Sequence, residues 1–196
     1  MTIAYALGNA LYLNITNECP CNCSFCIRNN AEGINPGESL WLEREPTLDE
    51  IIASINEADL TKYQEIVFCG YGEPTCRLDV LLKCAKSIKR LHPMSIRLNT
   101  NGLCDLINGK KTVPLLAECI DCISISLNAP DAKSYQALCE PIFGEHAYGA
   151  MIQFAKDCKA HISDTALSVV GHALDHNALE ACRSLCNSLD IPLRVR

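Results

Sequence analysis

The stretch NECPCNCSFCIRNN, residues 17–30, places four cysteines within eight positions, at Cys19, Cys21, Cys23 and Cys26. A short polar loop with four thiols has three chemical explanations, which are disulfide bonds, a zinc site or an iron–sulfur cluster. A cluster held by only three of these thiols keeps one iron open to a further ligand. Other features of the sequence discriminate between these three explanations.

Composition places the chain among single-domain proteins of the cytoplasm. The 196 residues are 48% hydrophobic, which is enough for one core, and we expect a single domain over residues 1–196. The N-terminus lacks a basic start, and Gly8-Asn9 predicts the tight turn of a hairpin in residues 1–10. No apolar run approaches the roughly 20 residues that cross a bilayer. With a net charge of −6 and no block of Lys or Arg, nonspecific nucleic-acid binding is not expected.

The same location disfavours disulfides as the explanation of the 14 cysteines. We interpret the ten cysteines outside the loop as reduced thiols that pack in the core as small apolar side chains. Structural zinc usually takes two separated ligand pairs, and one eight-residue loop cannot easily surround the ion. The best second pair, Cys119 and Cys122, straddles a helix end and a strand start, so zinc is the weaker alternative to an iron–sulfur cluster.

Strand and helix patterns alternate along the chain. The expected strands cover residues 11–16, 65–69, 95–100, 122–127, 165–171 and 191–196. The expected helices cover residues 47–60, 77–92, 104–119 with an interruption near Gly109, 131–139, 144–161 and 175–189. This alternation predicts parallel strands joined by right-handed crossovers, and six strands are too few for the closed eight-stranded barrel. The expected fold class is therefore α/β, an open partial (βα)6 barrel.

Polar and apolar side chains alternate within these strands, which parallel strands covered on both faces do not usually show. Polar residues share one face in four strands: Tyr12, Asn14 and Thr16; Arg97 and Asn99; Ser124, Ser126 and Asn128; Arg194 and Arg196. One sheet has only two edges, so solvent-facing edge strands do not explain four such strands. We therefore expect a concave polar face that holds a polar ligand and a convex apolar face under the helices.

The spacing Cys19-x-x-x-Cys23-x-x-Cys26 lets three thiolates of one loop hold a four-iron cluster. Three protein ligands leave one iron without a thiolate, and an open position of this kind is what a catalytic metal site needs. The loop also follows the carboxyl end of the first long strand, where the active sites of parallel α/β barrels gather. Cys21 is interpreted as a neighbouring thiol that does not ligate the cluster.

This spacing after a first strand, with Phe25 before the last cysteine, resembles the radical S-adenosyl-L-methionine (SAM) superfamily. The resemblance implies a 4Fe–4S cluster on Cys19, Cys23 and Cys26, with SAM bound to the fourth iron through its amino and carboxylate groups. It also implies a radical SAM enzyme, in which the reduced cluster cleaves SAM to methionine and a 5′-deoxyadenosyl radical that abstracts hydrogen from a substrate. An external one-electron donor such as flavodoxin or ferredoxin would reduce the cluster.

Further motifs agree with this resemblance. The segment Gly70-Tyr71-Gly72-Glu73-Pro74 resembles the Gly-Gly-Glu-Pro segment of the family, with Tyr71 in place of the first glycine. The resemblance implies that Gly72 and Glu73 receive the amino group of SAM. Adenine would pack near Val169–Gly171. The remaining SAM contacts that the resemblance implies are Phe25, Asn99, Asn101, Ser126 and Asn128.

The stretches YLNITNECPCNCSFCIRN, LWLEREPT, FCGYGEPT, LNTNG and LRVR are together similar to the small radical SAM proteins associated with the TatD nuclease family. No cysteine-rich extension follows them, so no auxiliary cluster is expected. Arg194 and Arg196 share the concave face and predict an anionic group on the substrate, unless they form a solvated edge. Arg28 either pairs with a carboxylate or caps the cysteine loop.

The sequence does not identify the substrate. The wide mouth of a six-stranded barrel suits a protein partner, as in activases that install a glycyl radical. It equally suits a small molecule covered by the loop 31–46. The alternative from a different class is a noncatalytic iron–sulfur or zinc-binding module.

Overall fold

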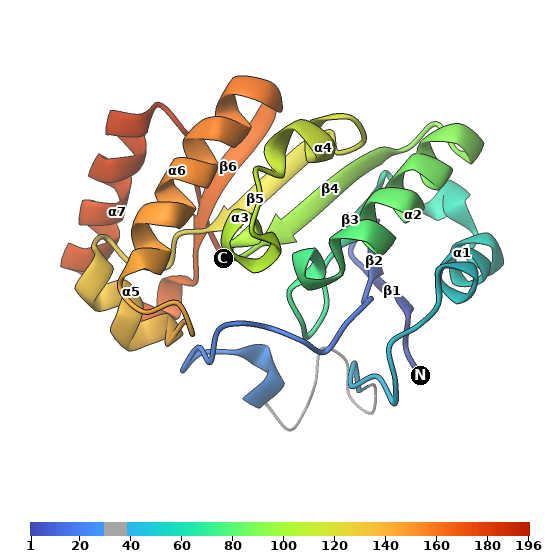
Figure 1. Ribbon diagram of the computed structural model, residues 1–196, viewed down its shortest axis with the longest axis horizontal. Helices are drawn as coiled ribbons and strands as arrows, with labels where there is room; N and C mark the ends of the chain where they lie inside the picture. Colours follow the sequence, from blue (N-terminus) through green and yellow to red (C-terminus); the bar gives the residue numbers. More distant parts are fainter. Residues whose placement is uncertain (30–38) are drawn as a thin grey trace.

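The computed structural model describes residues 1–29 and 39–196. In this part of the chain seven strands form one sheet whose spatial order follows the chain, from β1 to β7 (Figure 1). β1 (Ala4–Leu7) pairs antiparallel with β2 (Ala10–Leu13), and the turn between them contains Gly8 with a φ of 60°. Every later neighbouring pair is parallel. The later strands are β3 (Glu65–Phe68), β4 (Ser95–Thr100), β5 (Cys122–Ser126), β6 (Asp164–Val169) and β7 (Leu193–Val195).

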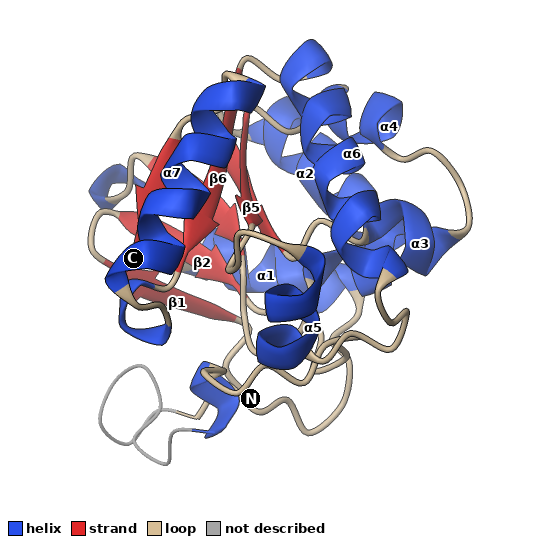
Figure 2. Ribbon diagram, turned by 90° about the vertical axis from the view of Figure 1, so that its left-hand side faces the viewer, coloured by secondary structure: helices blue, strands red, loops and turns tan. Residues whose placement is uncertain are grey.

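Helices connect the parallel strands and cover one face of the sheet, as the two views show (Figures 1 and 2). The α-helices are α1 (Leu48–Glu57), α2 (Leu78–Leu91), α3 (Cys104–Asn108), α4 (Val113–Ala117), α5 (Ala132–Cys139), α6 (His146–His161) and α7 (His176–Leu189). Short 3-10 turns are η1 (Ile27–Asn29), η2 (Leu60–Lys62), η3 (Pro74–Arg77) and η4 (Gly171–Ala173). Within residues 1–29 and 39–196, every helix is too short or too polar to cross a membrane.

The expected α/β class with an open sheet of six parallel strands, β2 to β7, is confirmed. The strand bounds are narrower than predicted, because β2 already ends at Leu13 and β7 covers only Leu193–Val195. The helix predicted over 104–119 is two helices, since Gly109 adopts a φ of 62° and ends α3. Asp105 accepts hydrogen bonds from the backbone nitrogen and hydroxyl of Thr112, which holds the turn before α4.

Local sequence signals explain where several helices begin. Thr47 and Glu50 form the capping box at the start of α1, as their spacing predicts. Asp131 and Asp175 cap α5 and α7 by accepting hydrogen bonds from backbone nitrogens of the first turn. These caps fix where the three helices begin.

The core lies between the sheet and the helices. Leu13, Phe68, Leu98 and Ile123 lie level with one another on adjacent strands, and each is at most 1% exposed. They belong to one apolar cluster that includes side chains of α2 and α6. The residues one position away have the opposite orientation and form the concave face, where Tyr12, Val67, Arg97 and Cys122 are in register. The central strands β4 and β5 therefore each have one apolar and one more polar face, as the alternation in the sequence predicts.

We expect two substitutions to move stability in opposite directions. Leu98→Ala removes a fully buried side chain from a central strand and should lower the free energy of unfolding by about 2–5 kcal/mol. A Cβ added at Gly149 in α6 meets no atom within 4 Å. Gly149→Ala should therefore raise the free energy of unfolding by about 0.5–1 kcal/mol. Urea unfolding followed by circular dichroism measures both. A Leu98→Ala protein as stable as the parent would contradict the described core.

Candidate functional site

The cysteine loop follows β2 and docks on the carboxyl end of α5. Three backbone hydrogen bonds join the two segments: Asn22 N to Cys139 O at 3.0 Å, Ser24 N to Leu138 O at 3.0 Å, and Ile142 N to Pro20 O at 2.9 Å. In Figure 1 the loop runs along the lower part of the molecule and reaches the lower end of α5. The loop is thus held by a helix that begins more than 100 residues later in the chain.

The thiols of this loop affect one another electrostatically. Hydrogen bonding by the Cys21 thiol is the main cause that lowers the pKa of Cys19. The Cys139 thiol, followed by that of Cys21, lowers the pKa of Cys23 to about 4. Cys26 lies on the next turn, where its backbone nitrogen donates to Cys23 O at 3.1 Å. The loop therefore presents the three predicted ligands within one turn-rich segment, and it favours the thiolate form that metals require at two of them.

Among the described residues, no three Cys, His, Asp or Glu side chains are arranged to hold a single metal ion. A four-iron cluster makes a different demand, because each of its cysteine ligands binds a separate iron. The chemistry of the donor set, three cysteines in one loop, fits such a cluster.

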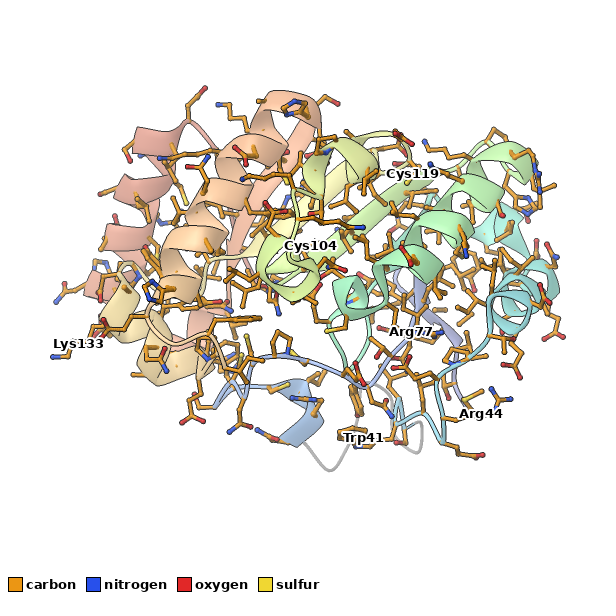
Figure 3. The ribbon with its side chains drawn as sticks, viewed as in Figure 1. Trp41, Arg44, Arg77, Cys104, Cys119 and Lys133 are labelled. Carbon is orange, nitrogen blue, oxygen red and sulfur yellow. The ribbon has the colours of Figure 1, made fainter. Side chains whose placement is uncertain are left out.

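Arg28 lies against the cysteine loop. Its guanidinium group donates to Asn17 O and to Cys21 O, both at 3.3 Å, and lies 5.9 Å from the ring centroid of Trp41. Trp41 also packs edge-on against Tyr71, and it is at the lower edge of the molecule in Figure 3. Of the two roles expected for Arg28, the structure thus favours capping of the loop.

The GYGEP turn after β3 pairs with the start of the cysteine loop. Gly72 N donates to Thr16 O at 3.0 Å, and Glu73 N donates to Glu18 O at 2.7 Å. An added Cβ on Gly72 would lie 2.4 Å from Thr16 O, so no side chain fits between the two segments. No hydrogen bond from the described part of the chain reaches the carbonyl oxygen of Tyr71 or Gly72. These free acceptors fit the ammonium group of SAM.

Glu73 is 4% exposed, and its carboxylate accepts four hydrogen bonds. Three come from Thr75 N at 3.1 Å, Thr75 Oγ1 at 2.7 Å and Thr100 Oγ1 at 2.8 Å, and the fourth from Asn101 N at 2.7 Å. Burial raises its pKa, although each of these donors acts in the opposite direction. The carboxylate joins the turn after β3 to the end of β4, with three of the hydrogen bonds on Oε1 and one on Oε2.

The predicted SAM contacts lie at the carboxyl ends of β4 and β5. Asn101 is committed to protein partners, because its Oδ1 accepts from Leu103 N at 2.9 Å and its Nδ2 donates to Cys21 Sγ at 3.8 Å. Asn99 and Asn128 each keep a buried Oδ1 that has no partner among the described residues. Two unpaired acceptors at this edge fit a polar ligand such as SAM. Ser126 and Phe25 complete the set, with Ser126 accepting from Arg196 and Phe25 packed against the core.

The arginines of the concave face differ in their partners. Arg194 pairs with Asp164 at 3.1 Å, and both side chains are exposed. Arg196 Nη2 donates to Ser126 Oγ at 3.2 Å, and no carboxylate of the described residues pairs with it. Arg97, which the sequence did not single out as a site residue, pairs with Glu65 at 2.8 Å and keeps a buried Nε without a partner.

A second segment supports the loop from the other side. Asn14 donates to Leu40 O at 2.6 Å, and Asn17 donates to Leu42 O at 2.7 Å. Arg77 forms an ion pair with Glu45 at 2.6 Å and donates to Ile15 O at 2.9 Å. The sequence carries no motif for these contacts, and the same is true of Cys139. The predicted cap over residues 31–46 lies in part outside the described residues.

The site as described is an open α/β half-barrel with a cysteine loop at the carboxyl end of its first parallel strand. A family model for the Radical SAM superfamily matches residues 13–184. The chain therefore belongs to the radical SAM superfamily, whose enzymes use a 4Fe–4S cluster and SAM. This confirms the expected superfamily and its cofactors, whereas the likeness to TatD-associated proteins stays a prediction.

Individual proteins also match the chain. Two probable dual-specificity RNA methyltransferases RlmN from Prochlorococcus marinus strains are each 27% identical over 156 residues, covering 77% of this chain and 42% of their own. The chain thus spans less than half the length of these relatives. The Streptococcus suis protein SuiB bound to the precursor peptide SuiA has a TM-score of 0.70 at 18% identity, covering 98% of this chain and 40% of that one. A radical SAM methyltransferase from Sphaerobacter thermophilus has a TM-score of 0.62 at 15% identity, covering 98% and 68%. The two structures support the fold.

Glu73→Gln should lower the free energy of unfolding by about 1–3 kcal/mol, because at least one of the four buried donors would then face an amide NH2 group. Glu118→Gln is the matched control, since Glu118 is exposed and, among the described residues, pairs only with Lys86. It should change stability by less than about 0.5 kcal/mol. Urea unfolding measures both variants. Equal stabilities of the two would rule out the anchoring role of Glu73.

Proposed function

We propose that this chain is a radical SAM enzyme whose cluster is held by Cys19, Cys23 and Cys26. The observation that carries the proposal is the docking of the cysteine loop between the GYGEP turn and the end of α5, which brings the loop to the carboxyl edge of the parallel sheet. When bound and reduced, the cluster supplies the electron that cleaves SAM to methionine and a 5′-deoxyadenosyl radical. An external one-electron donor such as flavodoxin or ferredoxin is required as a partner.

The chain's own residues bind and orient the cofactor. The carbonyls of Tyr71 and Gly72 accept hydrogen bonds from the ammonium group of SAM, and Glu73 holds their turn in place. The unpaired Oδ1 atoms of Asn99 and Asn128 accept from its polar groups further along the sheet edge. Asn101 and Ser126 border this edge, and the Phe25 side chain shields the loop from water.

The substrate is proposed to bind on the concave face and to carry an anionic group. Arg196 supports this, because its guanidinium group lies at the sheet edge beside Ser126 and lacks a carboxylate partner among the residues described. The matched relatives include probable RNA methyltransferases, and one similar structure holds a precursor peptide. A macromolecular substrate is therefore a candidate, including a protein that receives a glycyl radical. Membership of the TatD-associated group and a cytoplasmic location also remain proposals.

The test is cluster reconstitution under anaerobic conditions, followed by reduction with dithionite and addition of SAM. We expect the parent chain to bind four irons and to release 5′-deoxyadenosine. Single changes Cys19→Ala, Cys23→Ala and Cys26→Ala should each abolish the cluster and the product. Cys21→Ala should retain both.

Cys119→Ala is the matched control, because Cys119 is 2% exposed and lies among the helices far from the loop (Figure 3). It should behave as the parent. A reconstituted chain that leaves SAM intact would instead be a noncatalytic metal-binding module. Loss of the cluster in Cys21→Ala would replace the proposed ligand set.

A further inference from the structure

An arginine on the concave face has fewer partners than its chemistry allows. Arg97 lies in the central strand β4, and its side chain is 19% exposed. Its Nη2 atom makes both of its polar contacts, an ion pair with Glu65 at 2.8 Å and a hydrogen bond to the Tyr12 hydroxyl at 3.3 Å. Nη1 has no partner among the described residues, and neither has the buried Nε. A largely buried guanidinium group with unused donors suits an anionic ligand.

Tyr12 supplies a second donor beside Arg97. The two residues lie level with Val67 of the strand between them, and Val67 is fully buried. Their side chains meet across this strand, where the Tyr12 hydroxyl accepts from Arg97 Nη2. A phenol that accepts a hydrogen bond keeps its own hydrogen, and no acceptor among the described residues takes it. The Tyr5 ring, 5.3 Å from that of Tyr12, packs against it and limits its movement.

The position along β4 separates this pair of donors from the proposed SAM contacts. Arg97 and Asn99 are two residues apart and share the concave face, so they are about 6.6 Å apart along the strand. Asn99, with its unpaired Oδ1, is the one nearer the carboxyl edge. The helices pack on the opposite face of the sheet (Figure 1). A group bound by Arg97 would therefore lie deeper on the concave face than SAM, where the substrate is proposed to bind.

Glu65 determines which anion fits best. Its carboxylate is 2.8 Å from Arg97 Nη2 and offsets much of the positive charge. A doubly charged phosphate would be repelled by Glu65 more strongly than a singly charged carboxylate. Two neighbouring donors, Arg97 Nη1 and the Tyr12 hydroxyl, also match the two oxygens of a carboxylate. The charge and the donors together favour a carboxylate over a phosphate.

We propose that Arg97 and Tyr12 bind a carboxylate group of the substrate and so determine substrate specificity. The inference rests on the proposed function, because it takes the concave face to be the substrate site. It adds the chemical class of the anionic group and a place for that group away from Arg196 at the sheet edge.

The experiment is isothermal titration calorimetry of the reconstituted chain with sodium acetate or inorganic phosphate, at constant ionic strength. The parent should bind acetate more tightly than phosphate. Arg97→Gln should abolish acetate binding, and Tyr12→Phe should weaken it roughly three- to tenfold, as expected for one lost hydrogen bond. Glu65→Gln should strengthen it, because a competing negative charge is removed. Arg183→Gln is the matched control, since Arg183 is exposed on α7, and it should bind as the parent does.

Several results would overturn the inference. They are the absence of saturable acetate binding by the parent, tighter binding of phosphate than of acetate, and unchanged acetate affinity in folded Arg97→Gln. Should Arg97→Gln fail to fold by circular dichroism, the conservative variant Tyr12→Phe decides, and an affinity equal to that of the parent would refute the site.

Two further measurements separate this inference from the function beneath it. Every variant should keep four irons, because none of the changed residues is a proposed cluster ligand. A chain that cleaves SAM but does not bind acetate would refute the carboxylate site alone. A chain that binds acetate but leaves SAM intact would refute the proposed function.

Discussion

The structure depends on backbone pairing that continues beyond the last residues of β2 and β3. Thr16 O and Glu18 O, just before the cysteine loop, accept hydrogen bonds from Gly72 and Glu73. The two segments lie so close that a side chain at Gly72 would collide with Thr16 O. This contact sets the position of Cys19 relative to the turn that is proposed to receive SAM. The proposed cluster and SAM sites thus lie on two segments that pair with each other.

Glu73 extends this constraint across the sheet. A buried carboxylate is costly unless hydrogen bonds compensate it, and here four donors from the η3 turn and the end of β4 do so. The acidic residue of the GYGEP turn therefore holds neighbouring loops at fixed separation. The carbonyls of Tyr71 and Gly72, which accept no hydrogen bond from the described residues, are proposed to recognise the ammonium group.

Much of the fold follows from patterns within single segments. The alternation in SIRLNT and CISIS predicts two-faced strands, and Thr47 with Glu50 predicts the start of α1, because these signals are local. The location of the cysteine loop after the first long parallel strand also follows from the sequence. The partners of the site do not, since Cys139 lies 116 residues from Cys23 and belongs to no motif. Arg194 shows the same limit, because its pairing with Asp164 depends on the register of β6 and β7.

In the proposed site, one iron of the cluster has no protein thiolate and is open to SAM. The most direct measurement is the EPR spectrum of the reduced, reconstituted chain, recorded with and without SAM. SAM should change the g-values, because its amino and carboxylate groups would bind that iron. Identical spectra at saturating SAM would contradict it and would indicate a cluster whose four irons all carry ligands from the protein.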